Sequence, residues 1–142
     1  MTAAMLAGHN QYTRNFGVPS LVEKIAEIYG AKMGRQLDPM KEVLVTQGAN
    51  GALMSFINAF CNQGDGVVCF EPLFPNYVDL TEFAGGSVLG VPLTMNSSGE
   101  GDGDLKFDEE ALRDALSKRS TKIIVFNTPH NPTGKVFSVE EM

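Results

Sequence analysis

The chain has 142 residues and a hydrophobic content of 43%, enough to bury a core as one domain or as part of one. Its formal net charge of −6 and its lack of a basic stripe argue against nucleic acid or an anionic membrane surface as a partner. Its two cysteines, Cys61 and Cys69, are too few for a disulfide framework, so we expect buried free thiols in a reducing compartment. The cysteines and histidines show no metal-ligand spacing, and neither a signal peptide nor a membrane span is expected.

The first half of the chain predicts a helix, a strand and a second helix. Apolar residues at helical spacing follow Pro19, which suits a first helical turn, and Gly34 suits the end of that helix. The β-branched run Val43–Thr46 predicts a short strand, which ends at a glycine-rich break over 48–51. A second apolar stripe then predicts a helix over 52–60.

The second half continues this alternation. The predicted elements, in chain order, are a strand over 67–70, a helix over 77–83, a strand over 87–91, a helix over 108–116 and a strand over 122–126. Asn96–Asp104 is small, polar and glycine-rich, which predicts an exposed loop. Ser138 and Glu141 have the spacing of a capping box that starts a further helix.

Strands that alternate with helices predict an α/β fold with a mainly parallel sheet and flanking helices. The predicted strands at 67–70 and 122–126 contain continuous apolar runs, which is typical of strands buried on both faces. In such sheets, ligands bind at the carboxyl ends of the strands. The residues that directly follow each strand are therefore the candidates for chemistry.

The first candidate segment is Thr46–Gly51, which follows a predicted strand and opens a helix. Gly48 allows the backbone to approach a ligand closely, and the start of a helix presents free N–H groups to an anion. The segment therefore predicts an anion site, with phosphate as its ligand. It lacks the GxGxxG fingerprint and the Gly-Lys-Ser/Thr of a P-loop, and by itself it also fits an ordinary strand-to-helix turn.

The second candidate segment is Glu71–Tyr77, which follows the strand at 67–70 and contains two prolines. Phe74 offers a flat ring that can stack on a heteroaromatic ligand. The alternative is that Phe74 and Tyr77 pack under the loop as part of the core. Both interpretations stay open from the residues alone.

The third candidate segment, Asn127–Lys135, is the most specific stretch of the chain and has the sequence Asn-Thr-Pro-His-Asn-Pro-Thr-Gly-Lys. Asn127 and Asn131 lie four residues apart in a turn that proline stiffens. A neutral amide can donate a hydrogen bond to a phenolate-like oxygen without adding a formal charge. We expect Lys135 to be solvated and His130 to be a loop residue rather than a proton carrier.

This run resembles the signature of the class I/II aminotransferases, which are pyridoxal 5′-phosphate (PLP) enzymes of fold type I. The runs Asn10–Gly17, Val45–Gly51 and Glu71–Phe74 are similar to those of one subgroup, the kynurenine aminotransferases, also called glutamine transaminase K or cysteine-S-conjugate β-lyases. The resemblance covers residues 10–142, with the motifs in the same order.

At the phosphate end of PLP, the resemblance implies that Gly48, Ala49 and Asn50 bind the phosphate through backbone N–H groups. Members of the subgroup usually carry an aromatic residue at the position of Asn50, so only the backbone contact carries over there. Tyr12 matches a tyrosine that reaches the phosphate of the neighbouring subunit's cofactor. The resemblance therefore also implies a homodimer.

At the ring end of PLP, the resemblance assigns three side chains. Phe74 matches the residue that stacks on the pyridine ring, and Asn131 matches the asparagine that hydrogen-bonds the 3′-oxygen. Asn127 matches a residue near the cofactor and the substrate carboxylate. The peptide bonds before Pro72 and Pro132 are expected to be cis, as in related enzymes.

The activity that the resemblance implies is transamination between an amino acid (kynurenine, glutamine, an aromatic or a sulfur amino acid) and a 2-oxo acid, with cysteine-S-conjugate β-lyase activity in addition. The Schiff-base lysine of the family, its aspartate at the pyridine nitrogen and its substrate-binding arginine are expected beyond Met142. We therefore expect 1–15 to be an N-terminal segment and 16–142 to be a partial PLP-binding large domain, without the small domain. The 142-residue polypeptide alone is expected to be inactive.

Two other interpretations remain. The chain could be a non-catalytic truncated product. Such a product would bind either PLP or a full-length subunit, the latter through Tyr12 and the dimer surface. It could also belong to a different PLP enzyme of the same fold, such as an aminocyclopropane-carboxylate synthase or another β-lyase. The expected location is cytoplasmic, or mitochondrial if a transit peptide lies upstream.

Overall fold

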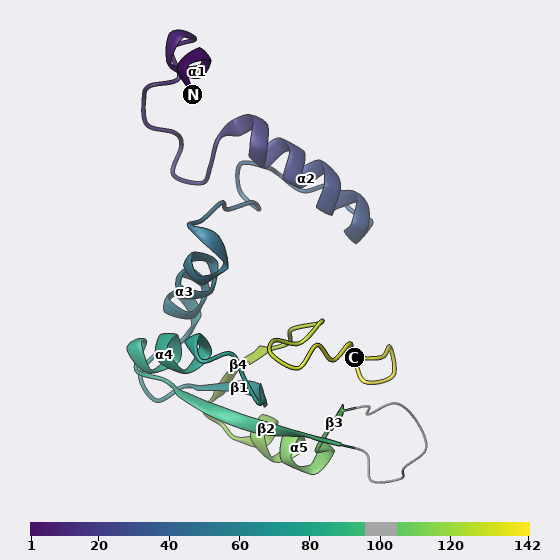
Figure 1. Cartoon of the computed structure of the whole chain (residues 1–142). Coiled ribbons are helices and arrows are strands. Elements are labelled where there is room, and N and C mark those ends of the chain that lie inside the picture. The colour runs from purple at the N-terminus through teal and green to yellow at the C-terminus, as the bar shows by residue number, and fades with distance from the viewer. Residues whose placement is uncertain (96–104) are drawn as a thin grey trace. The chain divides into compact units, whose positions relative to one another are not determined.

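The computed structural model describes residues 1–95 and 105–142, so the exposed loop predicted at Asn96–Asp104 lies outside the described residues. The chain divides into two compact units, Met1–Ala52 and Leu53–Met142 (Figure 1). The helices of the first unit are α1 (Thr2–Leu6), α2 (Pro19–Met33) and the first turn of α3 (Gly48–Phe60), which continues into the second unit. Each unit has a buried core of its own.

The first unit is built around α2, and the helix predicted between Pro19 and Gly34 is confirmed. Pro19 occupies the first turn, where its missing N–H costs no helical hydrogen bond. Gly34 ends the helix in a left-handed conformation with a φ of 66°. Val22 and Ala26 lie on the buried face of α2 and pack with Val43, which makes the small core of this unit.

The strand predicted over Val43–Thr46 is wrong, because in the described residues this segment is irregular chain outside the sheet. The Val45 N–H donates to the Phe16 carbonyl oxygen at 2.9 Å, which is a single bond and not a ladder. Val43 and Val45 pack instead on the α2 core. β-branched residues suit a half-buried extended segment, and only a neighbouring strand would have turned that preference into a sheet.

The second unit contains a four-stranded sheet with the strand order β3-β2-β1-β4 (Figure 1). Its elements are β1 (Gly66–Glu71), α4 (Asn76–Phe83), β2 (Ser87–Met95), β3 (Leu105–Phe107), α5 (Glu109–Ser117) and β4 (Thr121–Val125). β1 pairs in parallel with both β2 and β4, whereas β2 pairs antiparallel with β3. The predicted α/β fold with a mainly parallel sheet is confirmed, and β3 is a strand that the sequence pattern does not predict.

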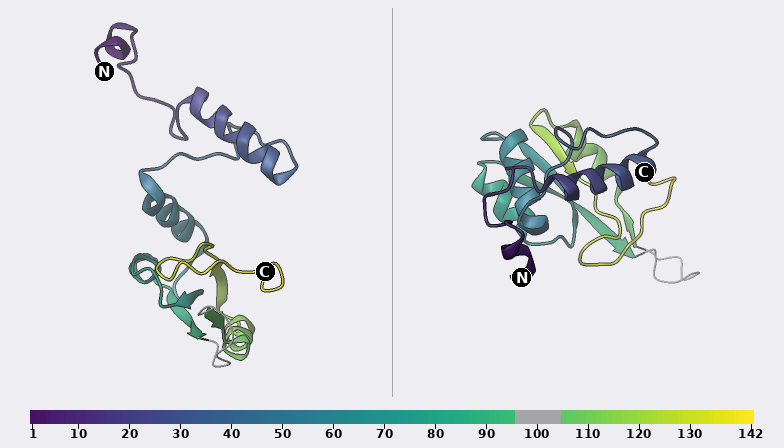
Figure 2. Two further views of the ribbon diagram at one scale, coloured as in Figure 1. Left: turned by 45° about the vertical axis from the view of Figure 1, so that its right-hand side comes forward. Right: turned by 90° about the horizontal axis from the view of Figure 1, so that it is seen from above.

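In the second unit, α4 and α5 lie on opposite sides of the sheet, as Figure 1 and the turned views of Figure 2 show. The sheet separates two apolar cores, one on the α4 side and one on the α5 side. Successive side chains of β1 alternate between them: Val67 and Cys69 join the α4-side core, and Val68 and Phe70 join the α5-side core. All four are at most 1% exposed. Cys69 and Cys61 are both buried free thiols, as predicted.

Two capping interactions are present: the one predicted at Ser138 and Glu141, and one at Asp108 that was not predicted from the sequence. Asp108 Oδ1 accepts hydrogen bonds from two backbone N–H groups in the first turn of α5, each at 2.9 Å. The Ser138 N–H donates to Glu141 Oε2 at 2.9 Å, and the Glu141 N–H donates to Ser138 Oγ at 3.3 Å. Residues 139–141 form a turn, however, so the helix predicted after Ser138 is not formed in the described residues. No helix of the described part of the chain has the length and apolar character needed to cross a membrane.

Candidate functional site

The start of α3 is a tight turn in the first unit. Gly48 adopts a φ of 71°, a left-handed conformation that glycine tolerates without strain. Its N–H donates to the Thr46 carbonyl oxygen at 2.9 Å, and the Thr46 hydroxyl donates to the Gly48 carbonyl oxygen at 2.8 Å. Gly48, Ala49 and Asn50 are exposed, and the first N–H groups of a helix have no intrahelical partner. This turn can therefore receive an anion.

The second and third candidate segments leave the sheet of the second unit at one edge. β1 and β4 pair in parallel, with Cys69 opposite Val125, so their carboxyl ends are neighbours. The segment with Phe74 follows β1, and the segment with Asn127 and Asn131 follows β4. The structure therefore brings these three side chains to the edge at which ligands of parallel sheets bind.

Phe74 is half-buried beside this edge. Its ring packs edge-on against Tyr77, with the centroids 5.7 Å apart and the planes at 81°, and it also contacts the α4-side core. Burial, followed by the nearby Cys69, raises the pKa of the Tyr77 hydroxyl. The packing of Phe74 with Tyr77 is confirmed, and a half-buried ring still offers surface to a flat ligand. The peptide bond between Glu71 and Pro72 is cis, as the resemblance implies.

The asparagine turn is closed by one of its own side chains. Asn127 Oδ1 accepts a hydrogen bond from the Asn131 N–H at 2.9 Å. Asn127 is half-buried, whereas Asn131 is exposed. The Asn131–Pro132 bond is cis as expected, and the Thr128–Pro129 bond is cis as well, which the sequence does not predict. Both asparagines carry side-chain N–H donors without a formal charge, the group that suits an anionic ring oxygen.

His130 holds the loop that carries Asn131. It is 4% exposed, and its Nδ1 lies 2.8 Å from Thr133 Oγ1. Its backbone N–H donates to the Lys135 carbonyl oxygen at 2.8 Å, and its carbonyl oxygen accepts from the Gly134 N–H at 2.6 Å. These bonds agree with the predicted loop role of His130.

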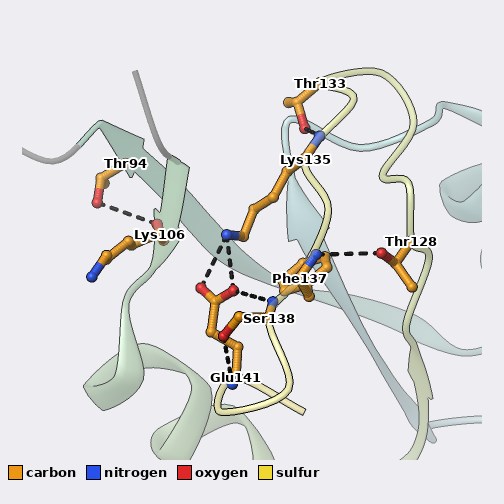
Figure 3. A network of polar contacts seen from close by, with 8 residues as sticks. All are labelled: Thr94, Lys106, Thr128, Thr133, Lys135, Phe137, Ser138 and Glu141. Atoms are coloured by element: carbon orange, nitrogen blue, oxygen red, sulfur yellow. Dashed lines mark hydrogen bonds and ion pairs between the residues drawn. The ribbon is translucent and has the colours of Figure 1, made fainter. Parts of the chain in front are cut away.

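The expectation that Lys135 is solvated is wrong. Its side chain is 2% exposed, and its ammonium nitrogen lies 3.0 Å from Glu141 Oε1 and 3.1 Å from Oε2 (Figure 3). Burial acts to raise the pKa of Glu141, but the Ser138 N–H and Lys135 together lower it overall. This ion pair was not predicted from the sequence. A signal was present in the capping-box spacing of Ser138 and Glu141, because a capping box directs the Glu141 carboxylate back toward the preceding residues.

The predicted site residues thus fall into two sets, one in each unit. Gly48, Ala49 and Asn50 form the helix start of the first unit, which also contains Tyr12, a fully exposed side chain. The second set, at the sheet edge of the second unit, comprises Phe74, Asn127 and Asn131. Across residues 1–95 and 105–142, no three His, Cys, Asp or Glu side chains gather in a way that could hold a metal ion.

Comparison with known proteins gives one family. The family model described as aminotransferase class I and II matches residues 3–142. Kynurenine–oxoglutarate transaminase 1 of Mus musculus is 42% identical over 137 residues, covering 94% of this chain and 32% of the mouse protein. Kynurenine–oxoglutarate transaminase 3 of Rattus norvegicus is 38% identical over 146 aligned positions, covering 99% of this chain and 31% of the rat protein.

Solved structures agree with the fold. The N-succinyldiaminopimelate aminotransferase of Mycobacterium tuberculosis matches with a TM-score of 0.84 at 34% identity, covering 99% of this chain and 35% of that one. The chain therefore spans about a third of the length of the relatives that it matches. The predicted fold-type-I large-domain architecture is confirmed for this part.

Proposed function

The chain belongs to the class I and II aminotransferase family, and from this premise we propose that it supplies the cofactor-holding part of a PLP-dependent transaminase. The proposed reaction moves an amino group between an amino acid and a 2-oxo acid. The observation that carries the proposal is the parallel pairing of β1 with β4, which brings Phe74 and the asparagine turn to one sheet edge.

Taken separately, the residues of each unit have the chemistry that one end of the cofactor would need. When bound, PLP supplies an electron-withdrawing ring that stabilises negative charge at the α-carbon of the substrate. The start of α3, with the exposed residues Gly48, Ala49 and Asn50, would hold its phosphate, because the positive end of the α3 dipole favours an anion there. The N–H groups of Ala49 and Asn50 would donate to it, and the Gly48 N–H would join them on leaving the Thr46 carbonyl oxygen. Tyr12, exposed in the first unit, would reach the phosphate site of a second subunit in a homodimer.

At the ring end, Phe74 would pack against one face of the cofactor and fix its tilt. Asn131 would donate a hydrogen bond to the ring 3′-oxygen, and this bond stabilises negative charge on that oxygen. Asn127 would do two things: its Oδ1 holds the Asn131 backbone at 2.9 Å, and its NH₂ group would donate toward the substrate carboxylate. These residues would orient the cofactor and exclude water from one side of the ring.

For the substrates, we propose kynurenine, glutamine, an aromatic or a sulfur amino acid as amino donor, with β-lyase activity on cysteine S-conjugates in addition. The support is the identity of 38–42% with proteins named kynurenine–oxoglutarate transaminases 1 and 3. A cytoplasmic location, or a mitochondrial one with an upstream transit peptide, completes the proposal.

The test is to titrate the protein, at its native length, with PLP and then to supply kynurenine and 2-oxoglutarate and measure glutamate. We expect saturable binding and turnover in the native-length protein. Asn131→Ala should weaken PLP binding about tenfold or more, because a hydrogen bond to a charged oxygen is lost. Asn58→Ala, an exposed position on α3, is the matched control and should bind PLP like the unmodified protein.

The 142-residue polypeptide is measured in parallel. We expect no glutamate from it, because none of its lysines matches the lysine that the family uses for catalysis. Steady glutamate production by this polypeptide would contradict that expectation. Binding of PLP without turnover by the native-length protein would favour the non-catalytic alternative over a transaminase.

A further inference from the structure

Phe137 anchors the segment that follows the asparagine turn. Its side chain is buried in the α5-side core, with ring centroids 4.5 Å from Phe126, 5.1 Å from Phe70 and 6.3 Å from Phe107. Its backbone N–H also donates to Thr128 Oγ1 at 3.3 Å (Figure 3). The segment is thus joined both to the sheet and to the turn itself.

Lys135 continues this connection at the other end of the turn. Its carbonyl oxygen accepts from the His130 N–H, and its side chain passes into the interior, where the ammonium lies 5.0 Å from the centre of the Phe137 ring. Figure 3 shows the ammonium pointing at the Glu141 carboxylate, and it contacts both carboxylate oxygens. A buried ammonium is costly unless it is paired, so the Glu141 carboxylate stabilises this conformation of Lys135.

The two partners are not equally buried, and this makes the pair asymmetric. The Lys135 side chain is 2% exposed, whereas the Glu141 side chain is 21% exposed. Loss of the Glu141 charge would take both carboxylate contacts away from a buried ammonium. Loss of the Lys135 charge would leave a carboxylate that water can reach and that still accepts from the Ser138 N–H at 2.9 Å.

We propose that Lys135 and Glu141 form a positioning pair that holds the Asn127–Asn131 turn at the sheet edge and thereby sets the affinity of this edge for PLP. The part of this inference that concerns PLP affinity rests on the proposed function. The part that concerns the position of the turn does not depend on it. The pair acts through the backbone bonds of His130, and it touches neither substrate nor cofactor in the reaction proposed above.

The experiment compares Glu141→Gln, Lys135→Met and the double variant in the native-length protein. Without cofactor, hydrogen–deuterium exchange is followed in the peptide that contains His130 and Gly134. We expect exchange there to rise about tenfold or more in Glu141→Gln, and less in Lys135→Met. The double variant should fall back below Glu141→Gln, because it removes the buried ammonium together with the carboxylate that this ammonium contacts.

The second measurement is PLP binding by the same proteins. Glu141→Gln should raise the Kd for PLP about tenfold. It should also raise the pH midpoint of the absorption band of bound PLP, because a displaced Asn131 no longer stabilises the charged ring oxygen. A role in global stability alone would lower the unfolding temperature and leave this midpoint unchanged.

The matched control is Lys118→Met, which removes the same charge from an exposed pair with Asp114. It should change neither exchange nor binding. The proposal is overturned if exchange and Kd in Glu141→Gln stay within about twofold of the unmodified protein, or if Lys118→Met has an equal effect.

Should Glu141→Gln not fold, Lys135→Met and the double variant decide. Should the unmodified protein not bind PLP, the proposed function fails, and exchange alone decides the positioning role.

Discussion

The two units of the chain use similar apolar patterns in different ways. In the second unit, β1 buries Val67 and Val68 completely, one on each face of the sheet. In the first unit, α2 also carries apolar residues at the spacing of its element, yet Leu21 and Ile28 are 46% and 43% exposed, and the buried face of the helix is the one with Val22. The spacing of apolar residues therefore predicts whether a helix or a strand forms. Whether those residues are buried depends on which other segments of the unit pack on that element.

The strongest test of this comparison is Phe70→Ala in the second unit. Phe70 contacts the rings of Phe107, Phe126 and Phe137, so its removal leaves a cavity and should lower the free energy of unfolding by about 3–5 kcal/mol. Urea denaturation measures this loss. Phe83→Ala is the control, since Phe83 is 74% exposed and should cost only about 0.5 kcal/mol. Equal losses for the two variants would contradict the described core.

The next largest effect is expected at Gly17 in the first unit. Gly17 has a φ of 123°, and a methyl group there would lie 2.9 Å from Val45 Cγ2 and 3.1 Å from Val22 Cγ1. Gly17→Ala should therefore destabilise this unit by about 1–3 kcal/mol, visible as faster amide exchange in α2. Gly8→Ala shares the positive φ but meets open space, so it should have the smaller effect. The reverse order would show that the Val22 core does not hold α2.

A local interaction in the second unit gives a smaller effect. Asp108→Ala removes the acceptor for two N–H groups at the start of α5 and should cost about 1 kcal/mol in thermal unfolding. Asp114→Ala, which breaks an exposed pair with Lys118, should cost at most about 0.5 kcal/mol. A cost for Asp114→Ala that matches the cap would argue against the capping geometry.

The smallest expected effect is on the chemical reactivity of the two buried thiols, Cys61 and Cys69. Burial, with a lesser contribution from Glu71, raises the pKa of Cys69 to about 12, and burial also raises the pKa of Cys61. Because the folded pKa exceeds the usual 9.0, the stabilisation by the buried Cys69 thiol is complete below that pH and is lost as the pH rises from 9 toward about 12. Iodoacetamide at about pH 8 should therefore label both cysteines only after denaturation. Rapid labelling of native Cys69 would rule out this burial.

The candidate site was predictable where its signals are local. The prolines and the four-residue spacing of Asn127 and Asn131 mark a stiff turn with two amide donors, and the structure shows that turn closed by the Asn127 side chain. Gly48 likewise marks a helix start in a left-handed conformation. Lys135 was not predictable in the same way, because a lysine after a glycine turn is ordinarily solvated, and its burial needs the Glu141 carboxylate six residues further on.

The sequence by itself determined those features whose causes lie within a few residues: Pro19 and Gly34 bound α2, Asp108 starts α5, and the run Val67–Phe70 makes a strand. Tertiary structure alone decided that Val43–Thr46 packs on α2 and forms no strand. It also decided that β1 lies between β2 and β4, and that this pairing carries Phe74 and the asparagine turn to one edge. The physical reason is that caps and turns are satisfied by neighbouring backbone groups, whereas strand pairing and charge burial depend on partners that the chain supplies from a distance.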